Sequence, residues 1–344
     1  MLFNIEADRG NQIVGYLVPD DFTKTPAVRI RDAGSLLAET PCLEERPSLV
    51  AAGRHGTGRC GFSIDESIVP NLAEKRALEL FDAETDILIY RRREETEVTR
   101  ERIFRFETHL FPLWSLDEHA EHRFQFFHKG VDRHGRETAT QMLQLNHASS
   151  IYLSGRVAFK SYENHLHDRF RCIALLQDPY TELAERLLLL KHVGKLTHQV
   201  LGPRDMITYR PVMEFAGQVE PDEKSLRRAF DMISREAIGV LSNPLTRQFA
   251  SDSLDEPPRK GAVARALTAL SSFALVGLRD DDSHFLETLE TLANLPKGTI
   301  PSLHRFSKVQ ELARELRQVS EAEMLLEQDL DIYETVRAAI EEAA

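Results

Sequence analysis

The residues best suited to chemistry lie between positions 122 and 136, where cations outnumber acids. This segment contains four Lys or Arg residues and three His residues but a single acid, Asp132, whereas the formal net charge of the whole chain is -12. A local excess of positive charge attracts anionic ligands. We therefore predict an anion site here. A solvated turn whose cations pair with nearby acids is the alternative.

The predicted anion contacts come from this basic turn and from the helix that follows it. Lys129 and Arg136 would supply cations, and Thr138 and Thr140 would add hydroxyl groups and backbone N–H donors. Backbone N–H groups at the start of a helix point toward a bound anion and favour negative charge. Downstream, Arg156 interrupts an apolar strand, so it either reaches an anion or forms a structural ion pair.

Two histidines are candidate bases. His128 ends a predicted strand and is the first candidate, and His165 is the second; with Lys129 they form the predicted catalytic set. Histidine can accept a proton near neutral pH, although a structural hydrogen bond is the alternative for either residue. The histidines of the chain form no HExxH pattern and have no Cys partner at a ligand spacing, so we predict no metal.

An α/β framework is expected to position these residues. A strand at 124–127 precedes the basic turn, a helix begins near Glu137, and a second strand occupies 171–177. Asp178 and Pro179 then provide an N-cap and a proline at the first position of another helix. Strands that alternate with helices are typical of an α/β domain with a mainly parallel sheet.

The C-terminal half is predicted to be mainly helical. An apolar strand at 273–277 and the helix after it would add one more β-α unit. The stretch 250–261 is polar and contains two prolines, so it is the best candidate for a loop over the site.

The first 93 residues have the pattern of a small all-β domain. Short candidate strands are separated by Gly, Pro, Asp and Asn turns. They lie at 13–17, 27–31, 61–64, 77–81 and 87–90. This spacing is typical of a β-sandwich. We therefore predict two domains, a β-sandwich accessory domain at 1–93 and an α/β domain with many helices at 94–344.

Composition excludes several classes of protein. A net charge of -12 argues against a nucleic-acid partner, because duplex binding draws on clustered cations. The chain has no apolar stretch near the roughly 18 residues of a membrane span. Three cysteines at no ligand spacing fit a reducing compartment, and the start of the chain lacks a signal-peptide pattern. We expect a cytoplasmic protein.

Two resemblances extend this interpretation. The motifs Arg46-Pro47-Ser48-Leu49, Ala52-Gly53 and Gly58-Arg59-Cys60-Gly61-Phe62 resemble a β-rich module found beside bacterial glycosyltransferase and surface-polysaccharide proteins. Residues 102–340 resemble the carbohydrate sulfotransferase superfamily. That resemblance rests on Phe126-Phe127-His128-Lys129 before Arg136-Glu137-Thr138-Ala139-Thr140, and on Gln177-Asp178-Pro179 with Glu182 and Glu185-Arg186.

The second resemblance implies a P-loop-like α/β fold and 3′-phosphoadenosine 5′-phosphosulfate as sulfate donor. It implies sulfuryl transfer to a carbohydrate in bacterial surface-polysaccharide biosynthesis, with other polysaccharide-assembly proteins as further partners. The family's donor-binding arginines and serine are replaced by Gln177, Glu182 and Glu185, so Arg156 and Arg186 are the cations expected to compensate. The alternative is a non-catalytic glycan- or partner-binding protein with a degenerate donor pocket.

Overall fold

The computed structural model describes residues 1–93, 98–196 and 200–343. Contacts within the chain divide it into two compact units. Unit 1 comprises Met1–Ile103, Ala120–Lys129 and His134–Leu153, and unit 2 comprises Phe104–His119, Gly130–Arg133 and Ser154–Ala344. The domain boundary predicted between residues 93 and 94 adjoins positions 94–97, which lie outside the described residues, so this boundary stays a prediction.

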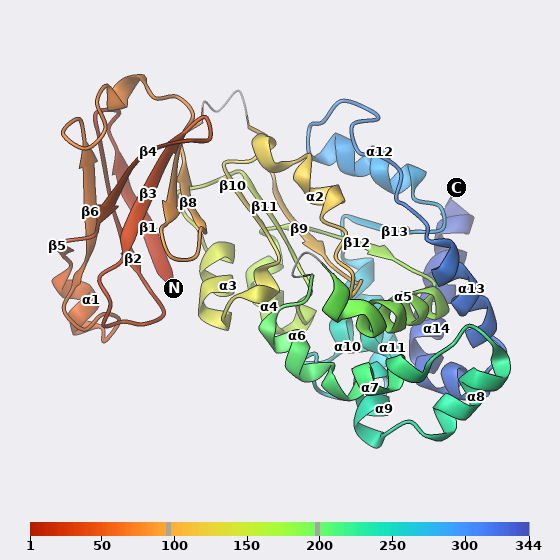
Figure 1. Ribbon diagram of the computed structural model, residues 1–344. Coiled ribbons are helices and arrows are strands. Elements are labelled where there is room, and N and C mark those ends of the chain that lie inside the picture. Colours follow the sequence, from red (N-terminus) through yellow and green to blue (C-terminus); the bar gives the residue numbers. More distant parts are fainter. Residues whose placement is uncertain (94–97, 197–199, 344) are drawn as a thin grey trace. The chain divides into compact units, whose positions relative to one another are not determined.

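The N-terminal part of unit 1 forms two antiparallel four-stranded sheets (Figure 1). Their strand orders are β1-β2-β6-β5 and β4-β3-β7-β8. Burial alternates along the strands, as in β3, where Val28 and Ile30 are buried while Arg29 and Arg31 are partly exposed. The strands are β1 (Leu2–Asp8), β2 (Gln12–Val18), β3 (Ala27–Asp32), β4 (Ser35–Pro41), β5 (Glu44–Glu45), β6 (Arg59–Asp65), β7 (Leu78–Asp82) and β8 (Leu88–Arg91). The predicted β-rich N-terminal region is confirmed at this level.

A third sheet has five strands in the order β10-β11-β9-β12-β13. The strands are β9 (Arg102–Phe106), β10 (Phe126–Lys129), β11 (Ile151–Gly155), β12 (Arg171–Leu176) and β13 (Leu275–Leu278). The strands β12 and β13 pair in parallel from Ile173 with Leu275 to Leu176 with Leu278. A helix connects β10 to its neighbour β11, as a parallel pair requires, and another helix connects β11 to β12 across β9. The predicted α/β class with a parallel sheet is confirmed.

The order of these strands creates a topological switch point. The chain leaves β9 for the side of the sheet that holds β10 and β11, and it leaves β12 for β13 on the opposite side. Ligands of open α/β sheets bind beyond the carboxyl ends of the strands at such a point. Side chains that follow β9, β11 and β12 are therefore expected to line a ligand site.

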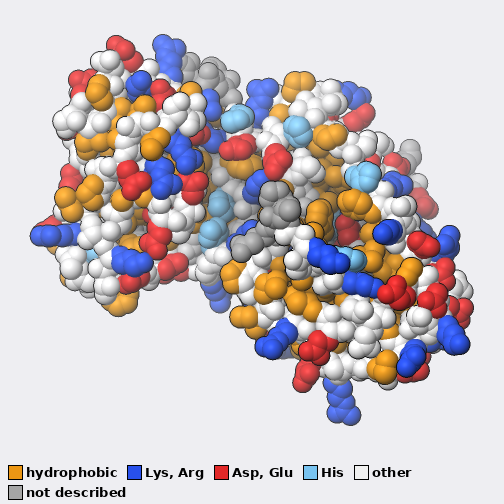
Figure 2. Space-filling model, viewed as in Figure 1, with side chains coloured by type: hydrophobic (Ala, Val, Ile, Leu, Met, Phe, Trp, Pro, Cys, Tyr) orange, Lys and Arg blue, Asp and Glu red, His pale blue; other side chains and the backbone are white. Residues whose placement is uncertain are grey.

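Helices make up most of unit 2. The α-helix that follows β12 begins as predicted, because the Asp178 side chain accepts a hydrogen bond of 2.9 Å from the Thr181 N–H and Pro179 occupies the first turn. No helix in the described part of the chain is long and apolar enough to cross a membrane. The face drawn in Figure 2 carries acidic and basic side chains interspersed with one another. The α-helices are α1 (Pro47–Ala51), α2 (Ser115–Glu118), α3 (Arg136–Leu143), α4 (Phe159–Leu166), α5 (Pro179–His192), α6 (Pro203–Thr208), α7 (Arg210–Gln218), α8 (Glu223–Asp231), α9 (Arg235–Leu241), α10 (Pro244–Ala250), α11 (Ala262–Ser271), α12 (Ser283–Leu292), α13 (Ser307–Leu316) and α14 (Ser320–Ala343).

Candidate functional site

A cavity of about 90 Å³ lies in unit 2, beyond the carboxyl ends of the parallel strands. Thr108 follows β9, Asp132 follows β10 and Arg156 follows β11, and all three line this cavity. The wall contains five arginines and three aspartates, which leaves an excess of two positive charges when all are ionised. These are Arg133, Arg156, Arg186, Arg204 and Arg247 with Asp132, Asp205 and Asp255. We call this the arginine cavity.

Three of the arginines hold buried N–H groups that have no hydrogen-bond partner among the described residues. The unpartnered atoms are Nη1 of Arg156, Nε and Nη1 of Arg186, and Nε of Arg247. Arg186 is 2% exposed and Arg247 is 6% exposed. An unsatisfied buried donor costs about 1–3 kcal/mol, and more when it is charged. Unpaired donors of three guanidinium groups that line one cavity are therefore expensive unless an acceptor meets them, and an anion is the acceptor that also balances their charge.

The Tyr209 ring lies close to two of these guanidinium groups. Its ring centroid is 5.8 Å from the guanidinium carbon of Arg156 and 5.7 Å from that of Arg186. The aromatic ring face attracts cations, so Tyr209 holds both arginines beside the cavity. Burial lowers the pKa of Arg156, but Tyr209, Asp205 and Asp132 together raise it by more. The net shift of this pKa is therefore upward. Arg156 thus keeps its charge.

Aspartates supply the counter-charges inside the site. Asp205 of α6 forms an ion pair with Arg156, and its other oxygen accepts a hydrogen bond of 3.0 Å from the Gly202 N–H. Asp132 accepts a hydrogen bond of 2.8 Å from the Arg156 backbone N–H, and burial raises the pKa of its carboxyl group. A carboxylate paired with a cavity arginine competes with any incoming anion for that arginine.

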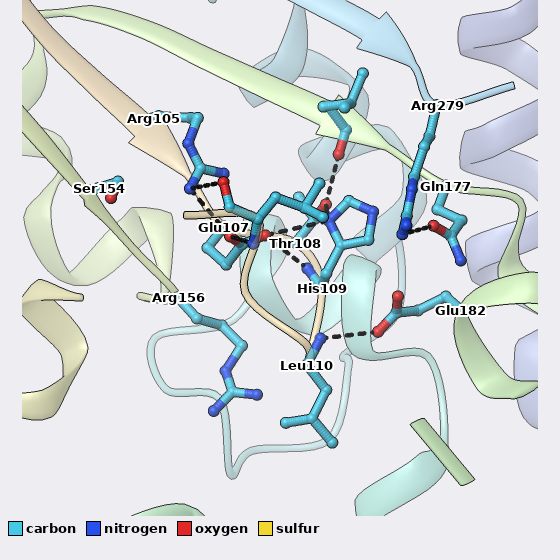
Figure 3. A network of polar contacts seen from close by, with 12 residues as sticks. Arg105, Glu107, Thr108, His109, Leu110, Ser154, Arg156, Gln177, Glu182 and Arg279 are labelled. Atoms are coloured by element: carbon cyan, nitrogen blue, oxygen red, sulfur yellow. Dashed lines mark hydrogen bonds and ion pairs between the residues drawn. The ribbon is translucent and has the colours of Figure 1, made fainter. Parts of the chain in front are cut away.

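A buried network behind the cavity fixes the loop after β9 (Figure 3). Arg105 donates to both oxygens of Asp117 at 2.6 Å and 2.7 Å, and to Glu107 at 3.0 Å. Glu107 also accepts from the Leu113 N–H at 2.7 Å. The Arg156 guanidinium in Figure 3 points away from this pair of charges. Arg105 is therefore neutralised within the network, whereas Arg156 is directed elsewhere.

The same loop holds a histidine next to the cavity. His109 Nδ1 lies 3.1 Å from a Glu107 carboxylate oxygen and 3.2 Å from the Thr108 hydroxyl oxygen. The Thr108 hydroxyl donates to the Leu175 carbonyl of β12 at 2.6 Å, which ties the loop to the switch point. His109 is 1% exposed, and its Nε2 has no partner among the described residues. Glu107 and Thr108 thus fix the orientation of the imidazole ring through Nδ1.

The residues expected to hold the donor's 3′-phosphate are paired with one another. Arg279, which follows β13, contacts Gln177 (Figure 3). Gln177 donates to Glu185 at 3.1 Å, and Arg279 lies 2.8 Å from Glu185. Glu182 accepts from the Leu110 N–H at 3.1 Å and from Arg186 at 2.9 Å. The Arg279 guanidinium group thus lies beside Gln177, where Glu185 neutralises it.

Two of the predicted site residues meet in this cavity. Arg156 and Arg186 both line it, as do Leu254 and Asp255 from the stretch 250–261 that was expected to lie over the site. Asp255 forms an ion pair with Arg204 at the exposed rim. The loop and the two compensating cations are thus brought together, although their role as donor ligands stays a prediction.

The other predicted residues lie elsewhere. Lys129 and His128 belong to unit 1, where they line a different cavity. His128 Nε2 lies 2.8 Å from His134 Nε2, and burial, with His134 as a second cause, lowers the pKa of His128 to about 3. His128 is therefore neutral near pH 7. A role as base stays a prediction, but the ring nitrogen that would carry it is already in contact with His134.

The remaining three cofactor contacts and the second base are also outside the arginine cavity. Arg136 is exposed at the first position of α3, and Thr140 is partly exposed on the same helix. Thr138 is buried, and its hydroxyl oxygen accepts a hydrogen bond of 2.7 Å from the Met1 amine. His165 lies on α4 in unit 2. None of these four lines the arginine cavity.

Sequence reasoning missed Arg247, Tyr209 and Asp205. Arg247 lies on α10 after an Asn-Pro pair that starts a helix, and Tyr209 and Asp205 belong to α6 and the residue after it. Helix starts of this kind occur throughout the chain and give no chemical signal. Only the tertiary fold brings these residues to the ends of β9 and β11.

Comparison with known proteins leaves the family open. No family model matches this chain, and no curated protein matches it. The described residues contain no group of three or more His, Cys, Asp or Glu side chains arranged to hold a metal ion. The arginine cavity is therefore the feature of the described residues that bears on function.

Proposed function

We propose that this protein recognises the sulfate or phosphate group of a larger ligand in the arginine cavity, without transferring that group. The observation that carries the proposal is the set of unpartnered buried N–H groups on Arg156, Arg186 and Arg247. Guanidinium groups match the oxygens of a sulfate or phosphate with paired hydrogen bonds. A carbohydrate ester is the proposed ligand, in line with the expected polysaccharide partners.

The size of the cavity supports recognition of one group, not of a whole nucleotide. A volume of about 90 Å³ holds a sulfate or phosphate, whereas pockets that bury an entire organic ligand measure about 300–1,000 Å³. The ester's sugar would then lie outside the cavity, toward Arg204 and Asp255 at the rim. Affinity for the oxyanion would come from the buried arginines, and the rim would select the sugar.

The pairing of Gln177, Glu185 and Arg279 supports the same proposal. A 3′-phosphate placed there would meet the Glu185 carboxylate, and like charges at close range repel. The donor 3′-phosphoadenosine 5′-phosphosulfate would lose one of its anchors. These contacts support the proposal of a degenerate donor pocket that keeps one oxyanion site.

Sulfuryl transfer from this donor to a carbohydrate is the second candidate, and the Glu107–His109 pair favours it. His109 Nε2 is buried without a partner, and His109 and Arg156 line the same small cavity next to the arginine cavity. A histidine oriented by a carboxylate is a common general base for a hydroxyl nucleophile. In this case the acceptor hydroxyl would lose its proton to His109.

Calorimetric titration separates the two candidates. We expect N-acetylglucosamine 6-sulfate to bind at least tenfold more tightly than N-acetylglucosamine, and also more tightly than 3′-phosphoadenosine 5′-phosphate. Arg186→Gln should lower affinity for the sulfated sugar at least tenfold, which equals about 1.4 kcal/mol. Mass spectrometry should detect no sulfate transfer from the donor to polysaccharide. Transfer that is abolished in His109→Asn would favour the second candidate instead.

Two further variants serve as controls for the titration. Arg314→Gln changes an arginine of α13 that is 70% exposed and outside the cavity, so affinity should not change. Arg204→Gln changes the rim, where the side chain is 65% exposed, and should weaken binding up to about fivefold because exposed pairs contribute little. Equal affinity for the sulfated and plain sugars would refute the proposal.

Three finer features are proposed alongside this function. We propose that the two antiparallel sheets of residues 1–93 pack face to face as a sandwich that serves as an accessory domain. We also propose a cytoplasmic location, supported by three free cysteines, Cys42, Cys60 and Cys172, which are all buried. A protease-resistant fragment that ends near residue 93 and melts cooperatively would support the accessory domain.

A further inference from the structure

A second and larger cavity lies in unit 1. Its volume is about 610 Å³, within the range of about 300–1,000 Å³ that is typical of small-molecule sites. The wall comes from the sheet that contains β3, β7 and β8, and from the segment 121–129. All lining residues belong to unit 1. Nothing in the proposed function depends on this cavity.

Strand geometry places charged and aromatic side chains together on its wall. Glu79 and Phe81 of β7 are two residues apart, so they share a face of the sheet, while Arg91 ends β8 and Arg93 lies two residues beyond it. The register pairs Glu79 with Arg91, and Arg91 Nε lies 2.7 Å from the Glu79 carboxylate. The charges of Glu79 and Arg91 therefore neutralise one another, and both side chains line the cavity.

The neighbouring strand β3 repeats this combination of groups. Arg31 stacks 4.7 Å from the Phe81 ring centroid and pairs with Asp86 at 3.2 Å. Asp86 is 54% exposed, so solvent and ligands can reach its oxygens. Phe127 adds a second aromatic ring from β10. The wall thus combines hydrogen-bond donors and acceptors with the aromatic rings of Phe81 and Phe127.

One buried guanidinium N–H group on this wall has no hydrogen-bond partner among the described residues. This group is Nε of Arg93, a residue that lines the cavity. Lys129 of β10 lines the same cavity and adds a second positive charge. The acids on the wall, Glu79, Asp86 and Glu121, each lie within ion-pair distance of an arginine. The wall holds four Lys or Arg residues against these three acids, so a negatively charged acceptor for Arg93 is favoured.

We propose that this cavity binds an acidic sugar, a hydroxyl-rich ring that carries one carboxylate. Sugar hydroxyls both donate and accept, so they match a wall where guanidinium groups alternate with carboxylates. The apolar faces of the ring would rest on Phe81 and Phe127. The sugar carboxylate would accept from Arg93 Nε and lie near Lys129.

Titration of the full chain with glucuronate and with glucose tests this inference. Glucuronate should bind in a saturable manner, at least tenfold more tightly than glucose. Arg93→Gln should lower glucuronate affinity to that of glucose, and Lys129→Gln, which is a second route if Arg93→Gln fails to fold, should weaken it at least threefold. Arg59→Gln, an exposed change on β6 outside this cavity, is the matched control and should bind normally.

A further variant distinguishes binding in this cavity from binding in the arginine cavity. Arg186→Gln should leave glucuronate binding unchanged, because Arg186 lies in unit 2. Loss of glucuronate binding in Arg186→Gln alone would overturn the inference and assign the ligand to the arginine cavity. Equal affinity for glucuronate and glucose would also overturn it, as would the absence of saturable glucuronate binding at concentrations up to about 10 mM.

Discussion

Replacing Asp205 by asparagine should strengthen oxyanion binding in the arginine cavity. Asp205 is paired with Arg156 and lines the cavity, so its carboxylate occupies an arginine that the ligand needs. Asparagine has nearly the same shape, and its carbonyl oxygen can still accept the hydrogen bond from the Gly202 N–H. The substitution therefore removes one negative charge and leaves the start of α6 in place.

Coulomb's law and the exposure of the ion pair set the expected gain in oxyanion affinity. A unit charge about 4 Å from a bound anion contributes about 4 kcal/mol at an effective dielectric constant of 20. The side chains of Arg156 and Asp205 are 12% and 17% exposed, so solvent screens part of this. A gain of at least about 1.4 kcal/mol, which is tenfold in affinity, remains as the expected minimum.

The free Asp205→Asn variant should also be less stable than the wild type. Removing one partner of a largely buried ion pair leaves the other charge uncompensated and costs about 3–5 kcal/mol at full burial. Bound sulfate would restore a partner for Arg156, and ligand binding to the folded state raises the melting temperature. The variant should thus melt lower without sulfate and show a larger rise in Tm with sulfate.

Thermal unfolding in sodium sulfate and in sodium chloride of equal ionic strength measures both effects. Asp231→Asn, an exposed change at the end of α8, is the matched control and should behave as the wild type. A sulfate-dependent rise in Tm that is equal or smaller in Asp205→Asn than in the wild type would refute the reasoning. It would mean that Asp205 supports the anion site and does not compete with it.

Two further predictions concern the framework of the site. Gly155→Ala should cost about 1–3 kcal/mol in urea unfolding, because its Cβ would lie 2.7 Å from both an Asp132 oxygen and a Val131 methyl carbon; Gly135→Ala, with no atom within 4 Å, is its control. Although burial raises it, Arg105 and His109 hold the pKa of Glu107 at about 2, below the usual 4.5. This stabilisation is present above pH 4.5 and lost as pH falls toward 2, so Glu107→Gln should cost on the order of 3 kcal/mol at pH 7 and progressively less between pH 4.5 and 2. A constant difference between wild type and Glu107→Gln across that pH range would contradict the assignment.

Local signals in the sequence were sufficient for much of the α/β framework. Asp178 and Pro179 start α5 as expected, because an N-cap and a first-turn proline act on their immediate neighbours. The strand β4 was missed because its apolar residues, Leu36 and Leu37, are exposed and do not alternate with polar residues. Patterns of burial predict strands only where one face is covered.

The candidate site was harder to predict, for a physical reason. Arg156 could be singled out because its charge breaks an apolar run in the sequence, and in the structure it lies directly after the last residue of β11. Arg247 and Tyr209 come from separate helices, and only the folded chain places them beside Arg156 and Arg186. Charge density along the sequence indicated residues 122–136 instead, although the cations of that segment are distributed over both units. Proximity in sequence and convergence in space are different properties.

The central claim is that the unpartnered N–H groups of Arg156, Arg186 and Arg247 in the arginine cavity bind an oxyanion. Crystals grown without sulfate and soaked in selenate, whose selenium scatters anomalously, test it directly. We predict an anomalous peak within hydrogen-bond distance of Arg186 Nε and Nη1 and of Arg156 Nη1, and no such peak in Arg186→Gln crystals. Selenate bound only at exposed arginines such as Arg314, with the arginine cavity free of selenium, would contradict the account.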